Sequence, residues 1–298
     1  MTPEAKIVLD QAQARRSLLG DLIQKNGYLP RQPIKTGLAN KVASIFIADI
    51  EVHGAKNLVT ATNLLDQGHE VTQVGNHTSD GDIVLRRLAF ERTGHADFAN
   101  RQLWVAGPNM LERWYTRIFM GAEESIMVVT PLDLRRIKRV STDEDSGLNP
   151  VNQSIVNKYL EAANLLNKRS AGVTQAKRAS GYGVSVFPES TRSRNGGMLQ
   201  EAIRETGVYL ARGYVLPVAG FGINEVIPVN GNFRIKRVNV RVDIGEPVPA
   251  REIWQKSVRF YGGRGHNPAE VAMAYVAALN SRLVPEDREA HYKELLAA

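Results

Sequence analysis

His77 and Asp82, five positions apart in the segment GNHTSDGD (residues 75–82), have the composition of an acid–base pair. An imidazole that donates one ring N–H to a carboxylate keeps its other nitrogen as an acceptor for a hydroxyl proton. Five residues along a regular helix would turn the two side chains about 140° apart. The pair therefore requires His77 to precede a helix and Asp82 to lie in its first turn, where the helix dipole favours a carboxylate. Gly81 is expected to ease the bend between them.

A second segment, FPESTRSR (residues 187–194), supplies fixed positive charge. Arg192 and Arg194 are two positions apart, so on an extended backbone both would point the same way and hold one phosphate. Glu189 is expected to orient an arginine or to bind a substrate hydroxyl. Each segment alone also fits a chance spacing or a surface salt bridge. Together they predict an enzyme that acts on a phosphorylated alcohol.

Short apolar strands and helices alternate along most of the chain. We expect strands at residues 71–74, 103–106, 126–130, 183–187, 214–219 and 237–244, and helices at 56–67, 81–93, 109–119, 152–178, 198–212, 267–282 and 286–296. Repeated alternation of this kind predicts an α/β fold with a mixed central sheet flanked by helices. His77 then lies at the carboxyl end of a strand, where open α/β sheets bind ligands.

The N-terminal part of the chain predicts a small helical element. Residues 3–26 have helical periodicity, with Thr2 as a cap and Pro3 at the first helical position. Pro30, Pro33 and Gly37 then predict a turn-rich connector. We therefore divide the chain into a helical N-terminal element, residues 1–40, and an α/β domain, residues 41–298.

Composition narrows the classes of protein that remain. The 298 residues include no cysteine, which excludes disulfides and thiolate ligands, and the histidines show no metal-ligand spacing, so no metal is expected. The formal net charge of +7 favours acidic carriers, anionic lipid or nucleic acid as partners. No window holds the roughly 18 apolar residues that span a bilayer, so we expect a soluble or peripheral protein.

The two segments together resemble a known family. Asn76-His77-x-x-x-x-Asp82 and FPESTRS (187–193) resemble blocks one and three of the glycerolipid acyltransferases, H-x-x-x-x-D and F-P-E-G-T-R-S. VLPV (215–218) resembles their fourth block. Further segments are similar to the soluble plastid-type glycerol-3-phosphate acyltransferases: DQGH (66–69), VAG (105–107), FMG (119–121), residues 126–129 and NPAEV (267–271). The resemblance covers most of residues 50–285.

Some positions depart from the plastid branch, whose third block is P-S-G-G-R-D-R. Pro188, Arg192 and Arg194 match that block, whereas the residues between them are more similar to the general family, and Ser190 replaces a glycine found in both. The plastid branch also has a lysine–histidine pair after its third strand. Here Arg135 and Arg136 are the candidates to take its place.

The resemblance implies acyl transfer from acyl carrier protein or coenzyme A to the sn-1 hydroxyl of glycerol-3-phosphate, with no cofactor besides this thioester co-substrate. It implies that His77 is the general base and Asp82 its orienting partner. Phosphate binding falls to Arg192 and Arg194, and Glu189 and Thr191 shape the acceptor pocket. The compartment implied is the cytoplasm or a plastid stroma, with peripheral contact to an anionic membrane as a further partner.

Two alternatives stay open at this point. The acceptor in the first is lysophosphatidic acid instead of glycerol-3-phosphate. In the second, the chain is a basic nucleic-acid- or lipid-binding protein without catalysis. Two clusters of basic residues, within 135–139 and 234–237, lack interleaved aromatic residues, so we expect no nucleic-acid partner. There is also no G-x-S-x-G elbow that would supply a serine nucleophile, so we expect direct attack by the acceptor hydroxyl.

Overall fold

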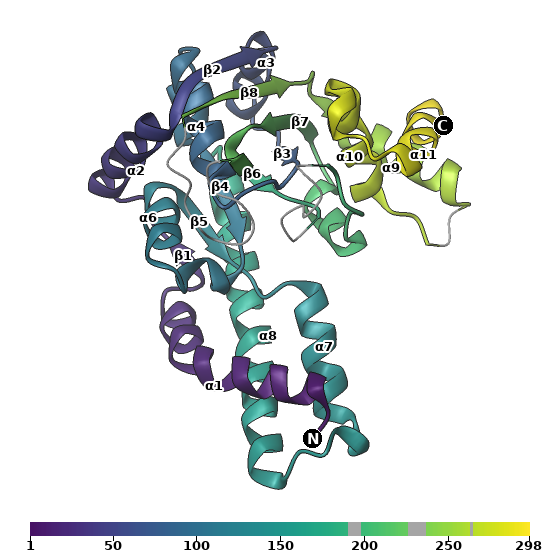
Figure 1. Ribbon diagram of the computed structural model, residues 1–298. Helices are drawn as coiled ribbons and strands as arrows, with labels where there is room; N and C mark the ends of the chain where they lie inside the picture. The colour runs from purple at the N-terminus through teal and green to yellow at the C-terminus, as the bar shows by residue number, and fades with distance from the viewer. Residues whose placement is uncertain (190–197, 226–236, 263–264) are drawn as a thin grey trace.

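A mixed β-sheet forms the centre of the molecule (Figure 1). The computed structural model describes residues 1–189, 198–225, 237–262 and 265–298. Within these residues the strands are β1 (Tyr28–Leu29), β2 (Ile47–His53), β3 (Val71–Gly75), β4 (Gln102–Ala106), β5 (Glu124–Met127), β6 (Gly183–Val186), β7 (Tyr214–Phe221), β8 (Val238–Ile244) and β9 (Val248–Pro249). They follow the order β1-β5-β4-β6-β3-β7-β8-β2, and β9 pairs with β7.

The centre of this sheet is parallel and its margins are not. Strands β5, β4, β6, β3 and β7 run parallel, whereas β8 is antiparallel to β7 and β1 is antiparallel to β5. All five residues of β3 are buried, as expected for a central parallel strand covered on both faces. The predicted mixed α/β fold is therefore confirmed.

Helices cover both faces of the sheet. They are α1 (Pro3–Gln24), α2 (Pro33–Phe46), α3 (Lys56–Asp66), α4 (Asp82–Arg92), α5 (Ala96–Asn100), α6 (Trp114–Ala122), α7 (Pro131–Thr142), α8 (Pro150–Ala179), α9 (Ala250–Tyr261), α10 (Pro268–Leu279) and α11 (Glu289–Ala297), with short 3-10 helices that include Pro108–Leu111 and Arg204–Leu210. One core packs α2 to α6 on the sheet, and a second packs α9 to α11 on the other face. The alternation of β7 shows this division, because Leu216 faces the first core and Val215 the second.

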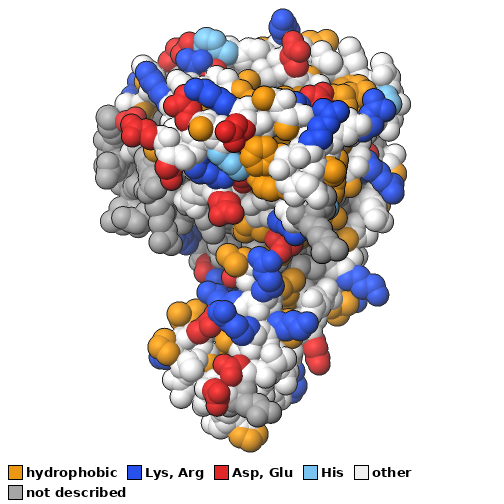
Figure 2. Space-filling view, turned by 90° about the vertical axis from the view of Figure 1, so that its right-hand side faces the viewer, with side chains coloured by type: hydrophobic (Ala, Val, Ile, Leu, Met, Phe, Trp, Pro, Cys, Tyr) orange, Lys and Arg blue, Asp and Glu red, His pale blue; other side chains and the backbone are white. Residues whose placement is uncertain are grey.

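A third apolar cluster holds α1 against α7 and α8, which extend away from the sheet (Figure 1). Val8 and Leu19 of α1 are fully buried there. The predicted start of α1 is confirmed, since Thr2 Oγ1 accepts the N–H of Ala5 and Pro3 is the first helical residue. On the side of the molecule that carries α9, α10 and α11, basic and acidic side chains are interspersed (Figure 2).

The structure corrects several expected elements. The connector predicted around Pro33 and Gly37 is wrong, because both residues belong to α2, which Pro33 starts without loss of a helical hydrogen bond. This helix packs on α6, apart from α1. Strand β2 was not expected, since its exposed Asp49 and Glu51 obscure the alternation of an edge strand. Helix was expected over residues 198–212, where the structure has only the 3-10 helix 204–210.

Candidate active site

His77 and Asp82 meet at the junction of β3 and α4. Strand β3 ends at Gly75 and α4 begins at Asp82, so His77 precedes the helix and Asp82 is its first residue. The distance from His77 Nδ1 to Asp82 Oδ2 is 3.0 Å, which confirms the predicted pairing. The expectation for Gly81 is wrong, because its φ of −85° is available to any residue.

The Asp82 carboxylate also fixes the backbone of the loop. It accepts the N–H of Thr78 over 2.6 Å, the N–H of Ser79 over 2.9 Å and the hydroxyl of Thr78 over 2.8 Å. Asp82 is 2% exposed, so these bonds replace the water that a carboxylate loses on burial. With an acceptor facing Nδ1, the proton of a neutral imidazole lies on Nδ1, and Nε2 is left as the basic nitrogen.

Phe187 holds the imidazole ring in place. The rings of His77 and Phe187 are stacked, with centroids 4.3 Å apart and planes inclined by 16°. The guanidinium carbon of Arg86 lies 4.8 Å from the centroid of the Phe187 ring, and Trp104 also stacks on this ring. The ring that holds His77 therefore comes from the start of the second sequence segment.

Glu189 joins the two segments directly. Its Oε2 accepts the backbone N–H of His77 over 2.7 Å, and its Oε1 accepts the backbone N–H of Gln200. Burial raises the pKa of the Glu189 carboxyl to about 8, although these two N–H groups favour the charged form. Both oxygens of Glu189 thus accept backbone N–H groups, and its expected role toward an arginine or a substrate hydroxyl stays a prediction. Thr191, Arg192 and Arg194, and Ser190 before them, lie outside the described residues.

Arg86 of α4 packs against the loop that contains His77, and the sequence did not predict it as a site residue. It is 1% exposed, and its Nη2 donates to the carbonyl of Asn76 over 2.8 Å. Among the described residues, its Nε and Nη1 have no hydrogen-bond partner. Burial lowers the pKa of the Arg86 guanidinium to about 10, opposed by the charges of Asp82 and Glu189. The spacing in the sequence could have indicated Arg86, because it follows Asp82 by four positions and therefore lies on the same face of the helix.

Asn76 anchors the same loop to strand β7. Its Nδ2 donates to the carbonyl of Gly220 over 2.8 Å, and its Oδ1 accepts the N–H of Gly220 over 2.8 Å. A side-chain amide thereby extends the pairing of β3 with β7 by one step. The position of His77 is thus fixed on three sides, by β7, by Asp82 and by Glu189.

Helix α6 also reaches the loop. Tyr115 Oη donates to Asp80 Oδ2 over 3.3 Å, and Arg113 Nη1 donates to Tyr115 Oη over 2.7 Å. Arg113 Nη1 is 3.9 Å from Asp80 Oδ2. The start of α6, at the surface, is therefore connected to the segment that contains His77 and Asp82.

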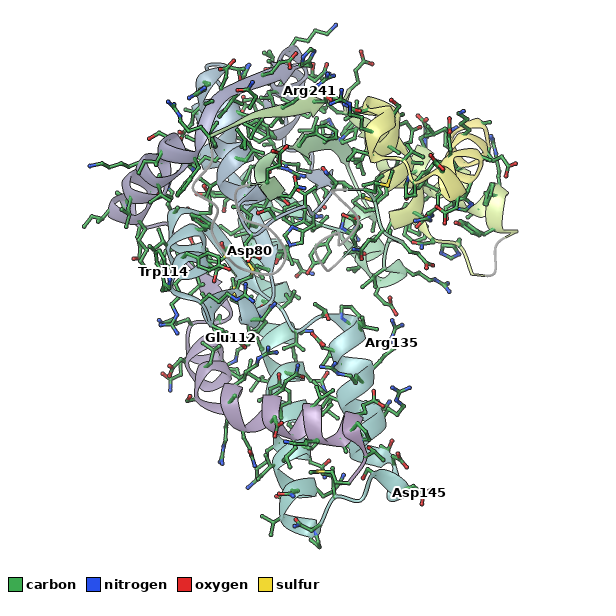
Figure 3. All side chains as sticks on the ribbon, in the orientation of Figure 1. Asp80, Glu112, Trp114, Arg135, Asp145 and Arg241 are labelled. Atoms are coloured by element: carbon green, nitrogen blue, oxygen red, sulfur yellow. The ribbon has the colours of Figure 1, made fainter. Side chains whose placement is uncertain are left out.

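Arg135 and Arg136 lie on α7 and bind other partners. Arg135 forms an ion pair with Glu205 in the 3-10 helix 204–210. Arg136 Nη2 donates to Gln11 Oε1 of α1 over 2.6 Å. Figure 3 shows Arg135 on α7 and Asp80 in the part of the molecule that holds the sheet. The described contacts of these arginines do not include the 77–82 loop.

Neither metal ligation nor a membrane span is found in the part of the chain that the structure describes. Among the described side chains, no group of three or more His, Cys, Asp or Glu is placed to hold a metal ion. No described helix combines the length and the apolar character needed to cross a bilayer.

Comparison with known proteins leaves the family open. No protein-family model matches the chain, and no similar curated protein is found. One similar solved structure is the crystal structure of the 1-acyl-sn-glycerophosphate (LPA) acyltransferase PlsC from Thermotoga maritima. It matches at 17% sequence identity and a TM-score of 0.40, over 87% of this chain and 93% of that one.

Proposed function

We propose that this protein is an O-acyltransferase that moves a fatty acyl group from a thioester, on acyl carrier protein or coenzyme A, to the sn-1 hydroxyl of glycerol-3-phosphate. The observation that carries the proposal is the His77–Asp82 pair, because it has the geometry of a general base with its orienting acid. Glu189 supports a phosphorylated acceptor, because its hydrogen bond links His77 to the sequence segment that contains Arg192 and Arg194.

In the proposed reaction His77 Nε2 accepts the proton of the acceptor hydroxyl while the hydroxyl oxygen bonds to the thioester carbon. Asp82 stabilises the imidazolium that forms, as the acid of a serine-type triad does. Collapse of the tetrahedral intermediate breaks the C–S bond, and the departing thiolate takes the proton back from His77. The products are the ester and the free thiol, and the enzyme returns to its starting protonation state.

For the phosphate we propose Arg192 and Arg194 as ligands, with Thr191 in the acceptor pocket. Paired guanidinium groups match the oxygens of a phosphate. Arg135 and Arg136 would first have to leave Glu205 and Gln11, which is why we place them second for this role.

Lysophosphatidic acid is the second candidate acceptor. The feature that favours it is the exposed side chain of Trp114, next to Tyr115, which binds the His77–Asp82 loop through Asp80. An apolar group beside the site suits an acceptor that already carries one acyl chain.

The test is an acyl-transfer assay with purified protein. Acyl thioesters of carrier protein and of coenzyme A are offered with glycerol-3-phosphate or with its monoacyl product. We expect transfer to glycerol-3-phosphate. Transfer only to the monoacyl compound would favour the second candidate, and no transfer to either would overturn the proposal. Arg192→Ala should raise the acceptor KM roughly ten- to a hundredfold. An unchanged KM would remove Arg192 from phosphate binding.

A further inference from the structure

Residues 199–203 follow the second sequence segment in the chain and form neither helix nor strand. An irregular segment has no helical turn or sheet ladder to satisfy its backbone, so other groups must hold it. One of these groups is Glu189, whose Oε1 accepts the N–H of Gln200 while its Oε2 accepts the N–H of His77. The position of residues 199–203 therefore decides whether Glu189 keeps both of its hydrogen bonds.

The first turn of α10 holds the same residues from the other side. Glu270 Oε2 accepts the N–H of Ala202 over 3.1 Å, and Asn267 Nδ2 donates to the carbonyl of Ala202 over 3.1 Å. Asn267 also caps α10, because its Oδ1 accepts the N–H of Glu270 over 3.2 Å. Both backbone groups of Ala202, which is 3% exposed, are thus bound by side chains that the helix start keeps in place. These side chains belong to NPAEV (267–271), a motif for which the resemblance implies no residue role.

The C-terminal part of the chain balances the charge of Glu270. Glu270 is 1% exposed, and its Oε1 forms an ion pair with Arg288 and lies 3.4 Å from His291 Nε2 of α11. The guanidinium carbon of Arg288 is 4.8 Å from the centroid of the Tyr292 ring. A buried carboxylate is costly without such partners, so they explain why Glu270 is tolerated. They do not explain its other oxygen, which binds a backbone N–H 68 residues earlier in the chain.

We propose that Glu270 is a positioning residue for His77. It fixes Ala202, whose segment places the N–H of Gln200 against Glu189. Glu189 in turn holds the backbone N–H of His77. Both carboxylates are almost fully buried, so water cannot readily replace a hydrogen bond that is lost between them. This inference rests on the proposed function, because Glu270 has this role only if His77 acts as the base.

A purely structural role for Glu270 predicts a different response to mutation. Removal of both charges together would then be tolerated, because apolar groups of similar volume can often replace a buried ion pair without loss of stability. A positioning role requires an acceptor for the N–H of Ala202 whatever the charge. Two double variants therefore separate the roles: Glu270→Gln/Arg288→Met keeps that acceptor, and Glu270→Met/Arg288→Met removes it.

The test compares acyl transfer by these two variants of the full chain, at equal folded fraction. We expect kcat of Glu270→Met/Arg288→Met to be at least about tenfold below that of Glu270→Gln/Arg288→Met, because a small displacement of the base is costly. The KM of the thioester should change little. Glu289→Gln/Lys293→Met, which removes an exposed ion pair from α11, is the control and should match the wild type. Equal kcat values of the first two variants would overturn the proposal, and so would a rise in the acceptor KM alone.

A second measurement does not depend on turnover. Amide hydrogen exchange at Gln200 and at His77 should be faster in Glu270→Met/Arg288→Met than in Glu270→Gln/Arg288→Met, because local opening exposes both N–H groups. Faster exchange at Gln200 with unchanged exchange at His77 would overturn the link to the base. A wild-type protein that transfers no acyl group would instead contradict the proposed function, and the exchange at His77 would still test this link.

Asn267→Ser covers the case in which the methionine pair does not fold. Serine caps a helix about as well as asparagine but lacks the Nδ2 donor for the carbonyl of Ala202. We expect kcat to fall roughly three- to tenfold, the effect of one hydrogen bond, with little change in thermal unfolding. Wild-type kcat in this variant, together with wild-type exchange at His77, would contradict the proposal.

Discussion

The backbone N–H of His77 donates a hydrogen bond to Glu189 Oε2 over 2.7 Å, across a sequence separation of 112 residues. Because Glu189 is 3% exposed, this bond forms in a site with little competing water. It fixes the start of the second segment against the loop of the first. The candidate base and the beginning of the segment that holds Arg192 and Arg194 thereby lie at the same end of the sheet.

Asp82→Asn should separate the role of Asp82 in orienting the His77 imidazole from its role in stabilising the fold. The amide oxygen can take the place of Oδ2, which accepts from Nδ1 of His77 and from the N–H groups of Thr78 and Ser79. Its NH2 group then faces the Thr78 hydroxyl, which donates to Oδ1 of Asp82, and the charge that stabilises the imidazolium is lost. We expect kcat to fall by roughly 10³- to 10⁴-fold, as in a triad that loses its acid, and stability to fall by about 1–3 kcal/mol. Steady-state rates and thermal unfolding measure the two effects. A kcat close to that of the wild type would exclude the orienting role.

Arg86→Met should show that Arg86 is a positioning residue. The variant keeps apolar contact with Phe187 but leaves the Asn76 carbonyl without its donor and removes the cation between Asp82 and Glu189. We expect kcat to fall by at least about tenfold, since a small misplacement of the base is costly, while the acceptor KM changes little. Arg86→Lys should restore part of kcat. A rise in KM alone would point instead to direct contact with the acceptor.

Gly75→Ala tests the position of the Arg86 guanidinium by placing a methyl group against it. A Cβ at Gly75 would lie 2.1 Å from Arg86 Nη1, so the side chain of Arg86 must move. We expect a loss of about 1–3 kcal/mol in stability, typical of overpacking, together with a lower kcat. Gly172→Ala in α8 is the control, because nothing lies within 4 Å of its Cβ and a helical alanine should add about 0.5–1 kcal/mol. Equal effects of the two variants would contradict the account.

The buried carboxyl of Glu189 should make stability depend on pH. Its folded pKa of about 8 exceeds its ordinary value of 4.5, so between these values the folded state binds more protons than the unfolded one. The Glu189 contribution is therefore fully present below pH 4.5 and is lost as the pH rises to about 8, with a slope of at most about 1.4 kcal/mol per pH unit. Glu189→Gln should flatten denaturant-measured stability across this window. An unchanged slope would show that Glu189 does not titrate there.

The position of the candidate base could be predicted from the sequence because neighbouring residues determine it. Residues 71–74, with a valine at each end, predict the strand, and the spacing of His77 and Asp82 sets where α4 must begin. Arg86 could not be predicted as a site residue, because its role depends on contacts of its guanidinium with Gly75, Asn76 and Phe187. Tertiary packing determines these contacts. The backbone-binding role of Glu189 likewise depends on how two distant segments meet. Helix α2 was missed because proline and glycine usually mark turns.

The most direct test of the central claim compares acyl transfer by His77→Ala with that of the wild-type protein, at equal folded fraction checked by thermal unfolding. His77 stacks on Phe187 at the surface of the loop and is partly exposed, so alanine should leave the fold intact. The account predicts that kcat falls by roughly 10²- to 10⁴-fold, the contribution of a positioned general base. A variant that transfers acyl groups at the wild-type rate would show that His77 is not the base.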